Sequence, residues 1–197
     1  LLGNELVQFA DATPLGAGQW RLSGLLRGRG GTEHAISTHQ AGEPFVLIDS
    51  PTTLLDPALA GPTEQALIGA LGLGDSVPAI SPVRLAGIGW RPLSPVHGQA
   101  ISPAGGGLEL RWTRRARGGW RWDDGVDLPL NEQREAYVVE FGPGTGTAVA
   151  RWDCDSPQLI LTPGEWSTLV SATPAGVFGV RQVGDRALSL PLVITPV

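Results

Sequence analysis

The sequence predicts an all-β protein of two domains, and two observations support this. Apolar and polar residues alternate along several short segments, which is the period of a strand that buries one face. Turn-forming residues separate these segments, with 28 glycines and 17 prolines among 197 residues. Hydrophobic residues still make up 42% of the chain, so it can build cores and is not a low-complexity sequence.

The clearest alternation lies in the second half of the chain. In residues 108–113, one face is predicted to carry Leu108, Leu110 and Trp112, and the other Glu109, Arg111 and Thr113. In residues 137–141, the corresponding sets are Tyr137, Val139 and Phe141 on one face and Val138 and Glu140 on the other. A tryptophan that meets a tyrosine from a neighbouring strand fills a two-sheet core well. The predicted core therefore includes Trp112, Tyr137, Leu110 and Val139.

Four further apolar runs follow the same size and spacing: Ala148–Trp152, Gln158–Leu161, Val177–Val183 and Leu188–Ile194. Roughly seven short strands in about 105 residues is the size of an immunoglobulin-like sandwich. The order and spacing of the first strands favour a fibronectin type III-like β-sandwich over residues 91–197. A cluster of four prolines around Gly87 and Gly89 marks the predicted boundary between the two domains: Pro78, Pro82, Pro92 and Pro95.

Residues 1–90 are predicted to form a small β-rich domain, barrel-like and with one or two short helices. Strands are expected at Glu5–Ala10 and Gln19–Leu26, with a turn through Pro14, Gly16 and Gly18 between them. The run "GTEHAISTH" predicts a helical turn capped by Thr32, and "GEPFVLID" predicts a buried strand. Residues Thr63 to Leu71 fit a helix and a strand equally well.

Charge and cysteine content exclude several classes of protein. The net charge of −5 repels phosphate, so nucleic acid is not the expected partner. The single Cys154 cannot form an internal disulfide, and we expect it to be a small side chain at a strand end. No apolar run reaches the roughly 18 residues of a membrane span, so membrane insertion is not expected. Methionine is absent and the sequence opens on Leu1, which predicts a fragment of a larger polypeptide.

Several residue groups resemble catalytic or metal sites, but their spacing does not support them. Gly74-Asp75-Ser76 is similar to a hydrolase nucleophile block, yet no histidine follows His97 to serve as base, which favours a serine turn. One cluster contains residue types that bind metal ions: His34, His39, Glu43 and Asp49. Two histidines five residues apart point to different faces of a helix or a strand.

Two further patterns lack what catalysis or phosphate binding requires. Glu33 and Asp49 could serve as a glycosidase pair, but nothing in the sequence sets their separation. The glycine-rich run 142–147 lacks the lysine of a phosphate-binding loop and is better explained as a hairpin loop. We therefore expect no catalytic, metal or cofactor site, and no enzyme activity.

Arginines and tryptophans interleave between Arg111 and Asp124, a combination that suits sugars and phosphorylated glycans. The candidate partner-binding or glycan-binding residues are Arg114, Arg115, Arg117, Trp120 and Trp122. The alternative is a solvated strand end whose charges are neutralised by Asp123, Asp124 and Asp127, with a tryptophan covering the edge of the core. In "GLLRGRGG", Arg27 and Arg29 could contact an acidic neighbouring subunit, or could belong to a plain exposed turn.

Several separated motifs together resemble a known family. The run from Trp20 to Asp49, then "RPLSPVH", "LRWTRRARGG" and "LPLNEQREAYVVEF", is similar to the C-terminal region of the baseplate hub proteins of gene transfer agents and related tailed phages. These host-specificity or tail-tip proteins carry a glycosidase-like TIM barrel upstream. The resemblance covers about Leu2 to Phe141. This chain lacks the family's tryptophan after Glu33 and its more basic residue after His97, so no ligand preference is carried over.

The resemblance implies a structural component of a phage-tail-like particle or prophage, assembled in the bacterial cytoplasm. Its expected partners are other tail and baseplate subunits, with cell-surface polysaccharide as a candidate ligand for host recognition. Exposed apolar or charged patches that need a partner would mark this function. The alternative is a glycan-binding module, marked by two or three exposed coplanar tryptophans. A hydrolase would require a cleft of converging acids or a Ser-His pair.

Overall fold

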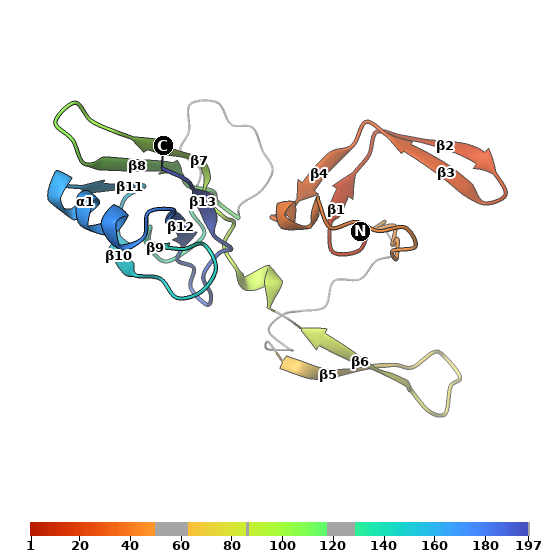
Figure 1. The fold of residues 1–197 in the computed structure, drawn as a ribbon. Coiled ribbons are helices and arrows are strands. Elements are labelled where there is room, and N and C mark those ends of the chain that lie inside the picture. Colours follow the sequence, from red (N-terminus) through yellow and green to blue (C-terminus); the bar gives the residue numbers. More distant parts are fainter. Residues whose placement is uncertain (50–62, 86, 118–128, 197) are drawn as a thin grey trace. The chain divides into compact units, whose positions relative to one another are not determined.

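The computed structural model describes residues 1–49, 63–85, 87–117 and 129–196 (Figure 1). Most of the regular structure is β, with one α-helix among the described residues, so the predicted all-β class is confirmed. Two compact units divide the chain, Leu1–Asp56 and Pro57–Val197, and each is described by itself. The domain boundary expected at residue 90 stays a prediction.

Seven strands of the second unit form two antiparallel sheets (Figure 1). One sheet has the order β11-β8-β7, from Gln158–Leu161, Leu108–Thr113 and Val96–Ile101. The other has the order β10-β9-β12-β13, from Ala150–Cys154, Tyr137–Gly142, Val177–Gln182 and Leu192–Ile194. Three strands facing four, with the chain crossing repeatedly between the sheets, is the arrangement of a fibronectin type III-like sandwich.

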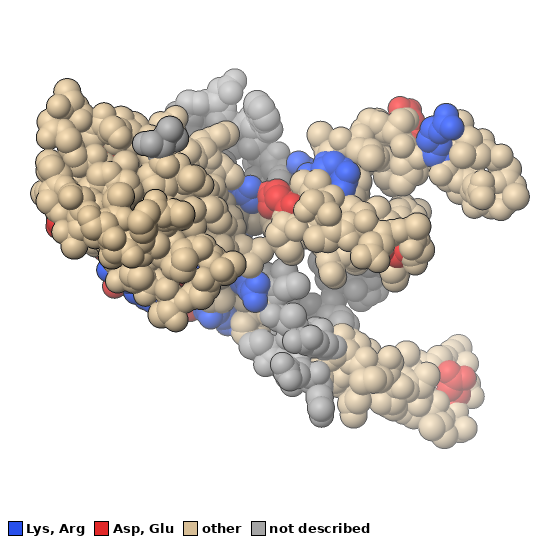
Figure 2. All heavy atoms as spheres, in the orientation of Figure 1, with Lys and Arg blue, Asp and Glu red and all other residues tan. Residues whose placement is uncertain are grey.

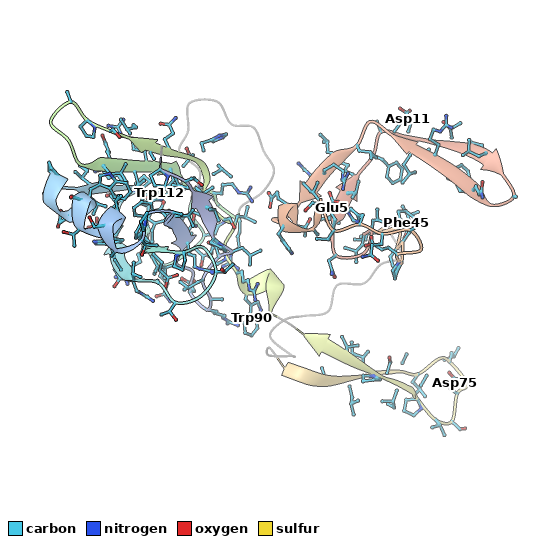
Figure 3. The ribbon with its side chains drawn as sticks, in the orientation of Figure 1. Glu5, Asp11, Phe45, Asp75, Trp90 and Trp112 are labelled. Atoms are coloured by element: carbon cyan, nitrogen blue, oxygen red, sulfur yellow. The ribbon has the colours of Figure 1, made fainter. Side chains whose placement is uncertain are left out.

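The core of the sandwich lies where the predicted alternation placed it. Leu108, Leu110 and Trp112 of β8 are buried, and Trp112 is labelled in Figure 3. The Trp112 ring meets Tyr137 of β9 edge to face, with ring centroids 5.2 Å apart. One expectation for β9 is wrong, because Val138 on its second face is also buried. Val138 therefore has a neighbouring strand on both sides, because β9 lies between β10 and β12 in the sheet.

The helix α1, Pro163–Ala172, connects β11 to β12 and was not predicted. Thr162 and Glu165 form a capping box: the Glu165 carboxylate accepts from the Thr162 backbone N–H at 2.8 Å, and the Thr162 hydroxyl accepts from the Glu165 N–H. Pro163 occupies the first turn, where no backbone N–H is needed. Trp166 packs against Phe141 with ring centroids 5.9 Å apart, so the helix adds an aromatic ring to the sandwich core.

Two further predictions for the sandwich are confirmed. The glycine-rich run 142–147 joins β9 to β10 as a hairpin loop, closed by a 2.8 Å hydrogen bond from the Val149 N–H to the Phe141 carbonyl. Cys154 lies at the end of β10, and burial raises the pKa of its thiol.

The first unit consists of two-stranded ribbons. Strand β1 (Leu6–Gln8) pairs with β4 (Leu26–Arg29), and β2 (Asp11–Gly16) pairs with β3 (Gln19–Ser23). These described strands do not close into the barrel-like domain that was expected. The predicted strand over residues 19–26 is interrupted at Gly24, which has a positive φ of 64° and separates β3 from β4.

Two local expectations for the first unit are wrong. Pro14 lies inside β2, so the turn begins later, at Gly16. The predicted helical turn exists as η1 (Glu33–Ala35), but the Thr32 hydroxyl does not cap it. That hydroxyl instead accepts from the Leu6 N–H at 3.0 Å and donates to the Arg29 carbonyl at 2.8 Å.

The segment "GEPFVLID" is not a buried strand. Its apolar residues, Phe45 to Ile48, are each more than half exposed. Its one bridge joins Phe45 to Leu2 at the start of the chain. No second sheet covers this segment within the described residues of the first unit, which is why it remains exposed.

A third ribbon belongs to the second unit. Strand β5 (Thr63–Ala70) pairs with β6 (Ala79–Leu85), so the undecided segment 63–71 is a strand; a short helix, η2 (Ile88–Trp90), follows. Asp75 lies in the connecting loop (Figure 3), where its carboxylate accepts from the Gly72 N–H at 2.8 Å. None of the helices in the described part of the chain has the length and apolar character needed to cross a membrane.

Candidate functional site

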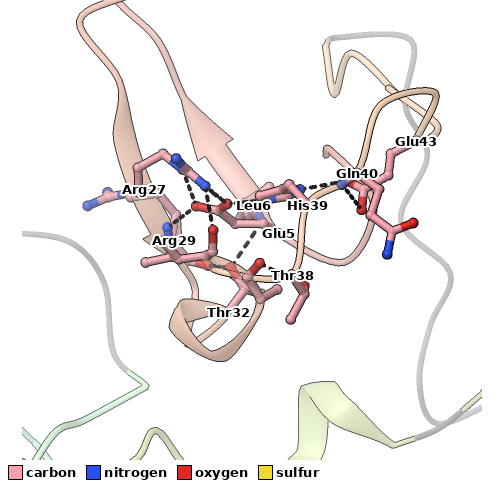
Figure 4. A network of polar contacts seen from close by, with 12 residues as sticks. Glu5, Leu6, Arg27, Arg29, Thr32, Thr38, His39, Gln40 and Glu43 are labelled. Carbon is pink, nitrogen blue, oxygen red and sulfur yellow. Dashed lines mark hydrogen bonds and ion pairs between the residues drawn. The ribbon is translucent and has the colours of Figure 1, made fainter.

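A fully buried carboxylate, that of Glu5, lies at the centre of the first unit (Figure 4). Glu5 directly precedes β1, and the antiparallel pairing of β1 with β4 brings Arg27 and Gly28 beside it. Its two oxygens accept from the Arg27 guanidinium, at 2.8 Å from Nε and 2.6 Å from Nη2. The Gly28 N–H donates to Glu5 Oε1 at 2.6 Å. We call Glu5, Arg27, Gly28, His39 and Glu43 the carboxylate network.

His39 links this carboxylate to a second one. Its Nε2 lies 2.5 Å from Oε2 of Glu5, and its Nδ1 lies 2.6 Å from Oε2 of Glu43. The Gln40 N–H donates to the other oxygen of Glu43 at 3.0 Å. Residues from the start, the middle and the end of the first unit therefore meet in one polar cluster.

Contacts within the carboxylate network change the pKa values of its members. The Arg27 hydrogen bonds, with help from His39 and Gly28, lower the pKa of Glu5 to about 2 although burial opposes this. The Glu43 and Glu5 carboxylates raise the pKa of His39, and His39 in turn lowers the pKa of Glu43. All three shifts favour the charged forms of Glu5, His39 and Glu43.

The carboxylate network takes the place of a hydrophobic core in the first unit. Among its described residues, the buried hydrophobic side chain is Ala35 of η1. Gly28 allows this close packing, because a Cβ there would lie 2.9 Å from the Glu33 Cα and the φ of Gly28 is 62°. The fold of the first unit thus depends on charge-assisted hydrogen bonds more than on apolar burial.

Acid is expected to loosen the first unit. Because the pKa of Glu5 falls from 4.5 to about 2 on folding, its ionised form contributes stability that is fully present above about pH 4.5. That stability is lost as the pH falls toward 2. The measurement is the Gly28 amide resonance followed from pH 6 to pH 2. A transition that is complete by pH 4 would contradict the shift.

The carboxylate network does not have the arrangement of a metal site. The two nitrogens of His39 face different carboxylates, so the acidic groups do not converge on one point with the ring. His34 lies in η1 with an exposed side chain. No group of His, Cys, Asp and Glu in the described ranges could hold a metal ion.

The arginines that were candidates for partner binding contact other parts of the chain. Arg27 is a member of the carboxylate network, and Arg29 ends β4. Arg117 Nε lies 2.7 Å from the buried Glu132 carboxylate, and Arg114 lies 3.9 Å from Glu135.

Arg115 is held through its backbone. Its N–H and C=O bond the side-chain amide of the buried Gln182. Trp120 and Trp122 lie outside the described residues, as do Asp123, Asp124 and Asp127. Among the described residues, Glu132 and Glu135 therefore supply the countercharges for Arg117 and Arg114. Partner binding by these arginines and tryptophans stays a prediction.

The other tryptophans differ in exposure. Trp152 and Trp166 pack against the sandwich core, and the Arg186 guanidinium lies 4.5 Å from the centroid of the Trp90 ring. Trp20 of β3, in contrast, is 60% exposed. A glycan site built on several coplanar tryptophans is not present among these residues.

The β5–β6 ribbon carries exposed apolar side chains that sequence reasoning missed. We call the following set the apolar ribbon, because each member is more than half exposed: Leu67, Leu71, Leu73, Val77 and Ile80. In the view of Figure 2, charged atoms are sparse over this ribbon. The sequence did contain a signal, since Asp75 is the one charged residue between positions 66 and 83. Strand periodicity could not reveal it, because none of the ribbon side chains that the structure describes is buried.

Residues 1–46 match the family model described as Rcc01698-like, C-terminal, a family found in gene transfer agent proteins. The match spans β1 to β4, η1 and the whole carboxylate network. No curated protein sequence matches the chain. A solved structure, the rat CD45 extracellular region, domains d3-d4, is similar at 9% identity and a TM-score of 0.35, covering 93% of this chain and 92% of that chain. A TM-score of 0.35 is too low to establish a shared fold, so the sandwich is identified from its own strand order and buried core.

Proposed function

We propose that this chain is a non-catalytic structural component of a phage-tail-like baseplate or tail tip. In this role it contacts neighbouring subunits and holds surface loops toward the host. The apolar ribbon is the observation that carries the proposal. The match of residues 1–46 to a family found in gene transfer agent proteins supports a phage-tail-like particle as the assembly.

The apolar ribbon has the properties of a surface that needs a partner. An isolated two-stranded ribbon is marginally stable in water, and burial of apolar surface stabilises by roughly 25 cal/mol per Å². Leucines at positions 67, 71 and 73 would gain this energy on docking. The near absence of charge favours an apolar protein surface as the partner.

The sandwich has a different part in this proposal. Its two sheets already bury their facing side chains, including Trp112 and Phe141, so it can act as a rigid spacer that needs no partner to fold. Its loops would then be held at fixed positions on the assembly.

Substitution of the apolar ribbon tests the proposal. A variant with Leu67→Ser and Leu73→Ser, in the complete parent polypeptide, is expected to reach assembled particles at least about ten-fold less than the parent, since each buried leucine contributes about 1.5–3 kcal/mol. The control is Ile160→Ser, because Ile160 is 64% exposed on β11 but lies outside the ribbon. The measurement is the amount of the protein that co-sediments with purified particles.

Thermal unfolding of the sandwich should be the same in the ribbon variant, the control and the parent, which separates assembly from folding. Incorporation of the ribbon variant at the parental level would contradict the proposal. Equal loss in the Ile160→Ser control would show that the ribbon has no special role.

A glycan-binding module is the second candidate, favoured by the exposed ring of Trp20 on β3. A glycan array probed with the chain separates the two functions. Binding to host polysaccharide that is lost on Trp20→Ala would support glycan recognition, whereas a blank array would leave subunit contact as the function.

A further inference from the structure

We infer that His39 is a protonation-dependent clasp, which ties residues 37–43 to Glu5 beside strands β1 and β4 and releases them when the ring loses a proton. The inference does not depend on the proposed function, because it concerns contacts within the first unit. It rests on the placement of one imidazole ring between two carboxylates (Figure 4).

The geometry requires the charged form of the ring. Both ring nitrogens of His39 lie within 2.6 Å of carboxylate oxygens, and an ionised carboxylate can only accept hydrogen bonds. Both nitrogens must therefore donate, which only the imidazolium can do. A neutral ring would donate to one carboxylate and turn a lone pair toward the other, so one of the two contacts would open.

The groups facing His39 decide which side moves. Glu5 and Glu43 face it directly, and Arg27 lies on the far side of Glu5. Glu5 is buried and keeps the Arg27 and Gly28 hydrogen bonds whatever the state of the ring. Glu43 is anchored by Gln40, within its own segment. Loss of the proton thus releases the segment that carries His39 and Glu43 and leaves Glu5 in place.

Release is confined to residues 37–43, because both ends of this stretch are held by bonds that do not involve the ring. Arg27 Nη2 donates to the Ile36 carbonyl at 3.2 Å, the Gly3 N–H donates to the Pro44 carbonyl at 2.9 Å, and the Val46 N–H donates to the Leu1 carbonyl at 2.8 Å. The exposed run Phe45 to Ile48 therefore keeps its attachment to the start of the chain in both states of the ring. Because the folded ring has a raised pKa, the clasp is closed below pH 6.5 and opens as the pH rises through that higher value.

Nuclear magnetic resonance of the full chain tests the clasp. The chain has three histidines, so His34→Gln and His97→Gln variants identify the His39 ring signals. We expect a His39 midpoint above pH 6.5, with the Gln40 amide moving at the same midpoint and the Gly28 amide staying fixed. A midpoint at or below 6.5, or a Gln40 amide that ignores the titration, would overturn the inference.

Variants separate the clasp from a general effect on folding. Glu43→Gln removes the carboxylate that contributes most to the raised pKa of the His39 ring, so it should lower the His39 midpoint. His39→Gln should leave residues 37–43 unprotected in hydrogen exchange at every pH, whereas in His34→Gln these residues should be protected as in the parent. If His39→Gln does not fold, the Glu43→Gln titration still decides the question, because an unchanged midpoint would contradict the clasp.

Discussion

Replacement of Trp112 with alanine is expected to unfold the sandwich of the second unit. The Trp112 ring is 5% exposed and packs edge to face against Tyr137, which belongs to the opposite sheet. Truncation of a buried tryptophan costs roughly 3–5 kcal/mol, from lost burial and from the cavity that remains. That is a large part of the total stability of a small domain, so the folded state would not persist at ordinary temperature.

The measurement is the denaturant midpoint of the sandwich, followed by near-ultraviolet circular dichroism. Trp20→Ala is the matched control, because it removes the same side chain from an exposed position in the first unit and should leave this midpoint unchanged. A Trp112→Ala variant that unfolds at the parental midpoint would show that the contact between the sheets is not what stabilises them.

Replacement of Glu5 with alanine is expected to unfold the first unit and leave the sandwich intact. The change removes the acceptor shared by Arg27, Gly28 and His39. Breaking a buried ion pair costs about 3–5 kcal/mol, and the lower end applies here because the Arg27 side chain is partly exposed and can return to water. With Ala35 as its buried hydrophobic residue, the described part of this unit has little apolar burial to offset the loss.

Backbone amide spectra measure this result residue by residue. Signals of residues 1–46 should collapse to unfolded positions in Glu5→Ala, while those of β8 and β9 stay dispersed. Asp11→Asn is the control, since Asp11 is an exposed acidic residue of β2 in the same unit (Figure 3). If residues 1–46 keep their dispersion in Glu5→Ala, the carboxylate network is not the element that holds the unit together.

The two units differ in how much of them the sequence could predict. In the sandwich, alternation along β8 is a local pattern with a direct physical cause, because one face of each strand meets the core. This pattern predicts the burial of Trp112 and Tyr137 correctly. Helix α1 was not predicted, although Thr162 and Glu165 have the spacing of a capping box. None of its residues is fully buried, so the helix has no strong apolar stripe that a sequence pattern could show.

The carboxylate network could not have been predicted in this way. Glu5, Arg27 and His39 are far apart in the sequence, and no periodic pattern relates them. The sequence did mark His39 and Glu43 as unusual, but as members of a metal-like cluster. The expected buried strand at Phe45 was wrong for a related reason, since apolar content alone does not show whether another layer will cover a segment.

Because the buried Glu5 carboxylate holds the first unit together, the exposed side chains of this unit contribute little to its stability. Trp20, Leu26 and Phe45 are each more than half exposed, so substitutions there are expected to alter the surface chemistry of this unit while its buried polar interior stays in place.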